Sequence, residues 1–240
     1  SAPIRRKVIQ PLDYTGTHSE LLRGLQGFWL PLPHLSGGAR LYDLSAFGRH
    51  GNFTDMPVSR WRTSPKSETP TLSFKSGGNF DHIDAGITSA LSSDTAITFS
   101  FFAKVDDSSE RNRVINIGVE GDKHAGIGIR DGEAKVYRSD GGNFNKRGGG
   151  VVSDNEWVLV TGGIQDKSAF LFLGANRLVD GDYFGAKWDL STANVYRIGA
   201  SATGSGPVDG EVAWGVAWAR KPSDFPIHSW ISQARRGFPD

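Results

Sequence analysis

The chain has 240 residues, a formal net charge of +1 and no cysteine. This length is enough for one large β domain or two small ones. The lack of cysteine excludes a disulfide framework and thiolate metal sites, and it fits synthesis in a cytosol. The balanced charge gives no overall attraction to nucleic acid or anionic lipid, and no apolar run approaches the roughly 20 residues that span a bilayer. We therefore expect neither nucleic acid nor a membrane as a partner.

The first 16 residues have the composition of an arm. Pro3 and Pro11 discourage both a helix and a central strand, and a basic run lies between them. Two interpretations of the arm remain: it packs on its own domain or is loose, or it reaches across to a neighbouring subunit or surface. Residues 17–25 follow with the capping-box pair Thr17 and Glu20 and predict a short helix. The arm residues that we expect to contact a partner are Ile4, Arg5, Arg6, Lys7, Val8 and Ile9.

Residues 27–53 form the stretch around which the rest of the chain is organised. It begins with an apolar run that contains Trp29 and is broken by two prolines, which indicates a strand that leads into a loop. Asp43 and Ser45 follow, and their side chains can form hydrogen bonds with nearby backbone amides, which predicts a tight turn here. A second strand is predicted to begin near Asn52.

Alternating apolar and polar residues predict short strands along the rest of the chain. The pair Asp131-Gly132 is the strongest hairpin signal, because it readily takes the positive φ that a two-residue turn demands. The glycine-rich segment 139–150 predicts a flexible loop, with a binding loop and a solvated hairpin tip as the two interpretations. The predicted strands lie within 71–74, 96–105, 114–118, 125–130, 134–138, 156–161, 169–173, 195–199 and 208–220.

The last predicted strand carries two tryptophans. We expect them to be core and not a platform for sugar stacking. A short C-terminal helix is predicted after this strand, capped by Ser223 and ended by Gly237. Alternation in the strand places on one face Val212, Trp214, Val216 and Trp218.

The opening stretch resembles the N-terminal signature of the laminin-G-like, or concanavalin A-like, jelly rolls. In that family a tryptophan-containing strand is followed by a Tyr-Asp-Leu-Ser turn, a glycine and an Asn/His-Gly pair. The resemblance continues over about residues 25–235. It implies an all-β chain, with an antiparallel β-sandwich jelly roll over residues 25–240, an arm and short helix over residues 1–24, and short terminal helices. The matching positions are Trp29, Tyr42, Asp43, Leu44, Ser45, Gly48, His50 and Gly51.

Exposed aromatic residues and acidic loops supply the candidate binding sites. Aromatic rings stack on sugars. Glycan or calcium sites of the family draw on acidic loops, so the resemblance makes Asp81 and Asp84 the metal candidates. Calcium takes six to eight oxygen ligands, and no loop here carries alternating acids, so we expect no cofactor, with calcium as the alternative. The glycan-binding candidates are Trp61, Phe144, Asn145, Arg147 and Trp188.

Three catalytic patterns are absent from the sequence. No strand has the Glu-x-Asp-x-x-Glu pattern of the glucanases of the wider superfamily, whose carboxylates act as nucleophile and acid. None of the six histidines forms a metal-binding i, i+4 pair with another. The run Gly204-Ser205-Gly206 lacks the strand-to-helix setting of a serine nucleophile. We therefore expect a protein that is not an enzyme.

The functions that remain are all binding or assembly functions. The leucine-rich segment followed by Gly-x-Trp-Leu-x-Leu-Pro resembles laminin-G-like proteins among the virion genes of tailed bacteriophages. That resemblance implies a capsid decoration protein, made in the host cytoplasm and located on the virion surface. Its partners would be the major capsid protein or other virion proteins, copies of itself in an oligomer such as a trimer, and host glycans. The alternatives are a carbohydrate-binding, lectin-like module of a secreted or cell-surface protein and an adhesion domain of a larger polyprotein.

Overall fold

The computed structural model describes residues 23–30, 40–56, 60–63, 70–75, 81–86, 96–118, 123–140, 144–184, 195–201 and 206–220. These residues form sixteen strands, all paired antiparallel. No helix within the described ranges has the length and apolar character needed to cross a lipid bilayer. The predicted arm, the predicted C-terminal helix and residues 17–22 of the first predicted helix lie outside the described residues. Residues 23–25 were predicted to end that first helix, but Gly24 has a φ of 73° and Leu25 begins a strand, so this end of the prediction is wrong.

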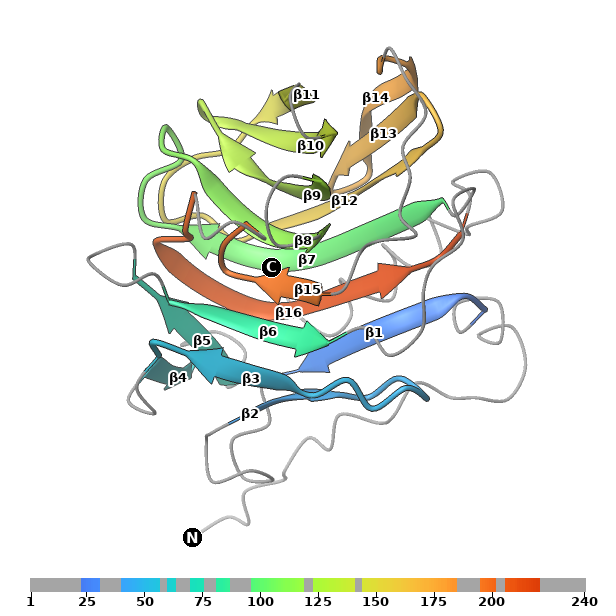
Figure 1. The fold of residues 1–240 in the computed structure, drawn as a ribbon. Coiled ribbons are helices and arrows are strands. Elements are labelled where there is room, and N and C mark those ends of the chain that lie inside the picture. The colour runs from blue at the N-terminus through green and yellow to red at the C-terminus, as the bar shows by residue number, and fades with distance from the viewer. Residues whose placement is uncertain are drawn as a thin grey trace, which may run out of the picture.

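The strands form one continuous ribbon that folds back on itself into two layers (Figure 1). The half termed the front sheet contains, in spatial order, β11 (Phe144–Val151), β10 (Glu133–Asp140), β9 (Lys123–Arg130), β8 (Asn112–Gly118), β15 (Val195–Ile198), β6 (His82–Gly86), β3 (Gly51–Thr54) and β2 (Arg40–Asp43). The half termed the back sheet continues with β1 (Leu25–Leu30), β16 (Gly210–Trp218), β7 (Ile97–Val105), β12 (Val158–Gln165), β13 (Ser168–Leu173) and β14 (Asn176–Asp182), while β5 (Pro70–Phe74) pairs with β16 and with β4 (Trp61–Thr63).

The two layers are joined at one side and packed together at the other. β1 pairs with β2, where Trp29 lies opposite Asp43, and so links the back sheet to the front sheet. At the two ends of the ribbon, β11 and β14 lie next to each other, and a Cβ added at Gly150 would come within 2.9 Å of Leu178. Figure 1 shows these two ends at the same end of the molecule. The predicted all-β jelly-roll sandwich is thereby confirmed.

The main core fills the space between the two layers. In β7, Ile97, Phe99 and Phe101 alternate toward it and are completely buried, as the sequence pattern predicts. Burial of an aliphatic or aromatic side chain of this size stabilises the fold by roughly 1.5–3 kcal/mol relative to leaving it in water. Burial of these three side chains of β7 therefore contributes strongly to the stability of the sandwich.

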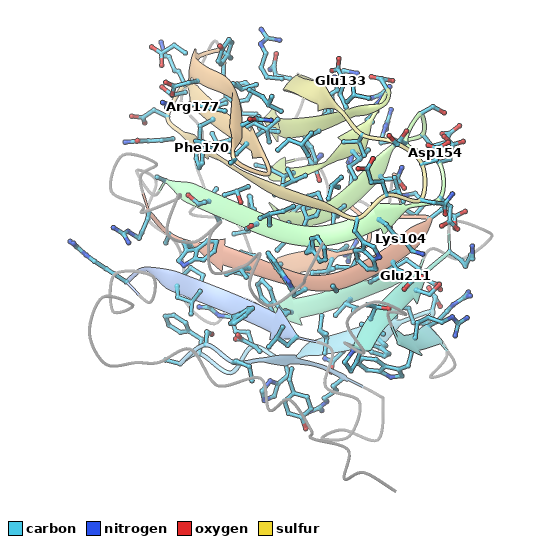
Figure 2. All side chains as sticks on the ribbon, turned by 180° about the vertical axis from the view of Figure 1, so that it is seen from behind. Lys104, Glu133, Asp154, Phe170, Arg177 and Glu211 are labelled. Carbon is cyan, nitrogen blue, oxygen red and sulfur yellow. The ribbon has the colours of Figure 1, made fainter. Side chains whose placement is uncertain are left out.

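A second apolar cluster lies on the opposite face of the back sheet, where Phe170 of β13 is seen in Figure 2. Trp214 and Trp218 belong to this cluster and are buried, as expected. Val212 instead belongs to the main core, because the β16–β7 register shifts at a β-bulge between Val212 and Trp214. The prediction that all four alternating residues of this strand share a face is therefore wrong.

Asp43 is the centre of the opening turn. Its carboxylate accepts hydrogen bonds from the backbone amides of Phe28, Ser45 and Arg49 and from the Ser45 hydroxyl, at 2.7–2.8 Å. The Trp29 indole N–H donates to the Arg49 carbonyl at 2.9 Å. These bonds tie β1 to the turn after β2. The residues that carry the family resemblance thus have a structural role here.

The β9–β10 hairpin has the turn that the sequence predicts. Asp131 and Gly132 have φ values of 57° and 69°, and positive φ at both central positions is what a tight hairpin with the right strand twist requires. The hairpin brings the outward side chains of β9 and β10 into direct register.

The glycine-rich segment that follows β10 is a strand over most of its length. β11 pairs with β10 from Phe144, opposite Ser139, to Val151, opposite Glu133. The expectation of a flexible loop is therefore wrong for residues 144–150, because a paired edge strand satisfies backbone groups that a loop would leave to water.

Candidate functional site

Four side chains from four neighbouring strands gather on the outer face of the front sheet. They are Arg113 of β8, His124 of β9, Tyr137 of β10 and Phe144 of β11, here termed the β8–β11 cluster. The Arg113 Cζ lies 5.1 Å from the ring centroids of both Tyr137 and Phe144. Those two rings stack with centroids 5.9 Å apart and an interplanar angle of 30°. Arg113 Nη1 also lies 3.2 Å from His124 Nε2. The cluster combines one cation with three flat rings.

Strand alternation explains why the cluster lies on the outer face. Ala125 and Ile127 of β9 and Val136 of β10 belong to the main core. The residues between them must therefore point outward, which places His124 and Tyr137 on the face away from the core.

Glycines on β9 make room for the Arg113 side chain. In the β8–β9 register Arg113 lies opposite Gly128, four residues from His124, so its side chain runs along β9 past the bare position of Gly126. The two strands approach closely beside a bulge, and a Cβ at Gly126 would lie 2.4 Å from the Ile115 carbonyl oxygen. Glycine is therefore required at this position by the backbone as well as by the arginine.

Burial shapes the chemistry of the cluster. Arg113, His124 and Tyr137 are 4–5% exposed, whereas Phe144 is 41% exposed and is the member that faces solvent. Burial lowers the pKa of Arg113, and the positive charges of Arg111 and Arg130 lower it further. Burial raises the pKa of Tyr137, so its hydroxyl stays protonated and remains a hydrogen-bond donor.

On this face, the buried Tyr137 hydroxyl and the buried Asn116 Oδ1 have no hydrogen-bond partner among the described residues. Both residues are Cα partners of Gly126, one from each side, and the Asn116 amide nitrogen is fixed by the Ala200 carbonyl. Buried polar groups are nearly always paired in native proteins. These two atoms therefore mark positions that a ligand or a water molecule would complete.

β11 divides the predicted glycan-binding residues between two faces. Phe144 belongs to the β8–β11 cluster. Asn145 and Arg147 face the other way, because Arg147 lies opposite the core residue Val136 in the β10–β11 register. The Arg147 Cζ lies 5.4 Å from the ring centroid of Tyr183, which is 36% exposed. The sequence thus identified one cluster member and two residues of a different surface.

Trp61 is partly buried against the main core. Its ring lies 5.8 Å from that of Phe53, at an angle of 43°. Part of its surface is therefore used for packing and is not offered to a ligand. Trp188 and the arm residues Ile4, Arg5, Arg6, Lys7, Val8 and Ile9 lie outside the described residues.

Asp81 and Asp84, the metal candidates, are each held by an arginine. Asp81 is almost completely buried, and its carboxylate lies 2.9 Å from Arg60 Nε and accepts a bond from the Lys75 amide. Asp84 accepts two hydrogen bonds from Arg197. Within the described ranges, no three His, Cys, Asp or Glu side chains gather as a metal site requires. Each of these two carboxylates therefore has an arginine of the chain as its counter-ion.

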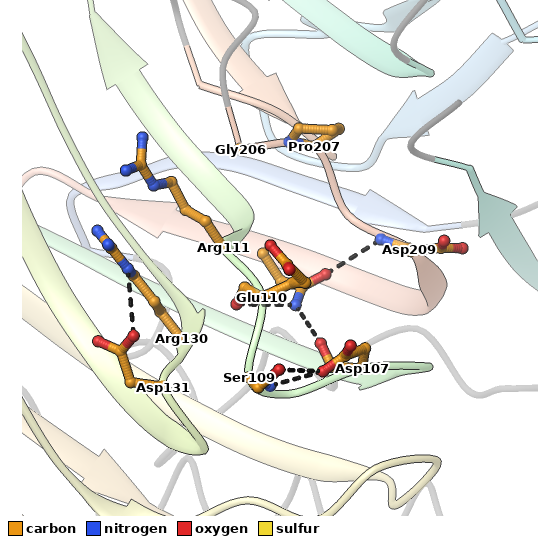
Figure 3. A pocket seen from close by; sticks show the side chains of 10 residues that line it. Asp107, Ser109, Glu110, Arg111, Arg130, Asp131, Gly206, Pro207 and Asp209 are labelled. Carbon is orange, nitrogen blue, oxygen red and sulfur yellow. Dashed lines mark hydrogen bonds and ion pairs between the residues drawn. The ribbon is translucent and has the colours of Figure 1, made fainter. Parts of the chain in front are cut away.

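A cleft of about 480 Å³ opens where the β7–β8 loop, the β9–β10 turn and the segment before β16 meet (Figure 3). Asn112, the residue before Arg113, lines this cleft, and Asp131 at its wall forms an ion pair with Lys146 of β11 at 2.7 Å. The charged residues that line the cleft are Asp107, Glu110, Arg111, Arg130, Asp131 and Asp209.

The carboxylates of the cleft are hydrogen-bond acceptors with local partners. Asp107 accepts bonds from the amide and hydroxyl of Ser109, and these bonds lower its pKa. The hydrogen bond from Lys146 lowers the pKa of Asp131. A glycosidase needs one carboxyl group with a raised pKa as its proton donor, and both of these pKa values are shifted the other way. Carboxylates and guanidinium groups in this arrangement suit the binding of hydroxyl groups.

Known structures share the fold at very low sequence identity. The receptor-binding domain of botulinum neurotoxin D matches with a TM-score of 0.65 and 13% identity, over 89% of this chain and 54% of that one. A botulinum neurotoxin type C structure matches with a TM-score of 0.64 and 9% identity, over 90% and 53%. Trypanosoma rangeli sialidase matches with a TM-score of 0.61 and 13% identity, over 90% and 34%. The likeness is one of fold.

The chain spans about half the length of these neurotoxin chains and about a third of the sialidase. No protein-family model matches the sequence, and no curated protein matches it either. Function must therefore be argued from the site.

Sequence reasoning found Phe144 but missed Arg113, His124 and Tyr137. A usable signal was present in β9, where His124 and two glycines alternate with core residues. Outward glycines in a central strand mark a place where something lies close to the backbone. The sequence pattern does not identify that neighbour as an arginine from β8.

Proposed function

We propose that this chain is a non-catalytic binding module that recognises a glycan at the β8–β11 cluster. The observation that carries the proposal is the exposed ring of Phe144, held on a paired strand and backed by the Tyr137 ring and the Arg113 guanidinium. The C–H face of a sugar packs on such a ring, and its hydroxyls need polar groups nearby. The adjoining cleft supplies carboxylates and guanidinium groups for that purpose.

Proteins with this fold support the choice of ligand class. Botulinum neurotoxin type C depends on an interaction with two ganglioside molecules to enter cells. The binding domain of botulinum neurotoxin DC forms a complex with SialylT. Because this chain spans only about half of those chains, the proposal takes from them only that the fold occurs in glycan-binding proteins.

A glycan array probed with the full chain tests the proposal. We expect a defined set of hits, and we expect Phe144→Ala to weaken binding to them about 3- to 10-fold through the loss of ring stacking. Phe47→Ala is the matched control, because Phe47 is 46% exposed on the turn after β2 and away from the cluster. An array without hits, or equal effects of the two variants, contradicts the proposal.

We also propose that the protein does not cleave the glycan that it binds. The lowered pKa values of Asp107 and Asp131 support this part of the proposal. Each glycan bound on the array is to be incubated with the protein and analysed by mass spectrometry. We expect the glycans to remain intact. Cleavage that is lost in Glu110→Gln would show that a carboxylate of the cleft acts as a catalyst.

We propose capsid decoration as the second function, which is compatible with the first. The support is the resemblance to tailed-phage virion proteins and the basic arm, together with a closed, rigid sandwich that presents the β8–β11 cluster on its outer face. In this role the arm binds the major capsid protein at the virion surface and the cluster faces host glycans. We expect saturable binding to undecorated shells and weaker binding after replacement of Arg5, Arg6 and Lys7 by serine. Shells that bind no protein rule this function out.

A further inference from the structure

We propose that the glycan recognised at the β8–β11 cluster is an acidic sugar, and that its carboxylate is bound by the Arg113 guanidinium and the Tyr137 hydroxyl. The inference rests on the proposed glycan-binding function and adds the chemical class of the ligand. It is carried by a buried cation and a buried hydroxyl donor that lie side by side on the outer face of the front sheet.

Arg113 is the cation. Its side chain is 5% exposed and contacts two aromatic rings, with Arg111 and Arg130 acting on it as like charges. A planar carboxylate is a preferred partner of a buried guanidinium, because its oxygens accept N–H bonds from the guanidinium fork.

Tyr137 is the second donor. Its ring lies 5.1 Å from the Arg113 Cζ, and its hydroxyl has no hydrogen-bond partner within the described part of the chain. Because burial keeps this hydroxyl protonated, it can only be satisfied by an acceptor brought to it or by water. A carboxylate oxygen is such an acceptor.

His124 fits the same arrangement. A guanidinium has donors only, so the contact of Arg113 Nη1 with His124 Nε2 makes Nε2 the acceptor and puts the ring proton on Nδ1. The imidazole is then neutral and does not repel the Arg113 guanidinium. On the far side of Gly126, Asn116 Oδ1 is an acceptor that suits a hydroxyl of the same sugar.

Access to Arg113 is controlled by Phe144. The phenyl ring is the exposed member of the cluster and lies 5.1 Å from the Arg113 Cζ, at the edge strand of the front sheet. The proposal requires that this ring moves aside far enough for the carboxylate to reach the guanidinium, while it still contacts the sugar.

Calorimetric titration of the full chain with 3′-sialyllactose, its carboxylate methyl ester and lactose tests the inference. We expect the free acid to bind at least about tenfold more tightly than the ester or lactose, as for a hydrogen-bonded charge.

Arg113→Gln should remove the difference in affinity between the acid and the ester. Tyr137→Phe should weaken binding of the acid about fivefold without lowering the unfolding temperature, because the lost hydroxyl has no partner in the free protein. Arg177→Gln, an exposed arginine of β14, is the matched control and should change nothing.

The outcomes separate the two proposals. Equal affinity for acid, ester and lactose overturns the inference and leaves the glycan-binding function in place. Array hits that are confined to neutral sugars also overturn the inference and leave the glycan-binding function in place. A preference for the acid that survives in both Arg113→Gln and Tyr137→Phe overturns the assignment of the site. An array without hits removes both the function and the inference.

Discussion

Arg197 and Asp84 form a two-point ion pair across the outer face of the front sheet, with Nε to Oδ1 at 2.5 Å and Nη2 to Oδ2 at 2.8 Å. The two residues are Cα partners of β15 and β6, so the pair fastens one strand to the next. Burial by itself would raise the pKa of Asp84, but hydrogen bonds from His82 and Arg197 outweigh it and lower this pKa to about 2.

This pair predicts a specific loss of stability in acid. Because the folded pKa of about 2 lies below the ordinary value of 3.8, the unfolded chain binds the proton first as the pH falls. The stabilisation is complete above the unfolded pKa and is lost as the pH falls from about 4 through 2. Asp84→Asn should lower stability at pH 7 and flatten this part of the profile, as urea unfolding at several pH values will show. Glu110→Gln, an exposed carboxylate, is the control, and an unchanged profile in Asp84→Asn contradicts the prediction.

Tyr196→Phe should leave the protein as stable or make it up to about 1 kcal/mol more stable. The Tyr196 hydroxyl is buried and has no hydrogen-bond partner within the described residues, while its ring packs 5.3 Å from that of Trp29. Removing the hydroxyl relieves the cost of an unpaired buried group and keeps the ring contact. Denaturant midpoints measure the effect. A loss of more than about 1 kcal/mol would mean that an unseen partner is present.

Asp43→Ala should destabilise the protein by about 3–5 kcal/mol. The substitution removes an acceptor of four hydrogen bonds and leaves several donors of a buried turn unsatisfied. Ser45→Ala removes one of these bonds and should cost about 1 kcal/mol. Asp180→Ala, at an exposed ion pair, should cost less than about 1 kcal/mol. Urea unfolding compares the three variants, and similar losses in all of them would contradict a special role of Asp43.

Gly199→Ala should cost about 2–4 kcal/mol. Gly199 has a φ of 92°, and a Cβ there would meet the Phe74 ring at 2.3 Å. Neither the backbone conformation nor the packing of the main core accommodates a side chain. Gly86→Ala is the control, because no atom lies within 4 Å of its added Cβ. The thermal unfolding midpoints of the two variants should differ clearly, and equal midpoints would refute the argument.

The candidate site was visible in the sequence only in part. Phe144 was found because an aromatic residue among glycines and polar residues is conspicuous. Arg113 was not, because nothing in its local sequence shows that the side chain will run along a neighbouring strand toward His124. Asp84 was chosen as a metal candidate for its charge, yet its partner Arg197 is separated from it by 113 positions in the chain.

The resemblance to the laminin-G-like jelly rolls predicted the all-β sandwich, and the local sequence predicted the Asp131-Gly132 hairpin and the buried face of β7. The hairpin and the buried face follow from local rules, because a period of two selects the face of a strand and a short turn needs particular φ values. Three features depend on tertiary contacts: the strand over residues 144–151, the bulge that separates Val212 from Trp214, and the meeting of one cation and three rings from four strands. Register and bulges depend on pairing between distant segments, and the local pattern of one strand carries no information about its partner.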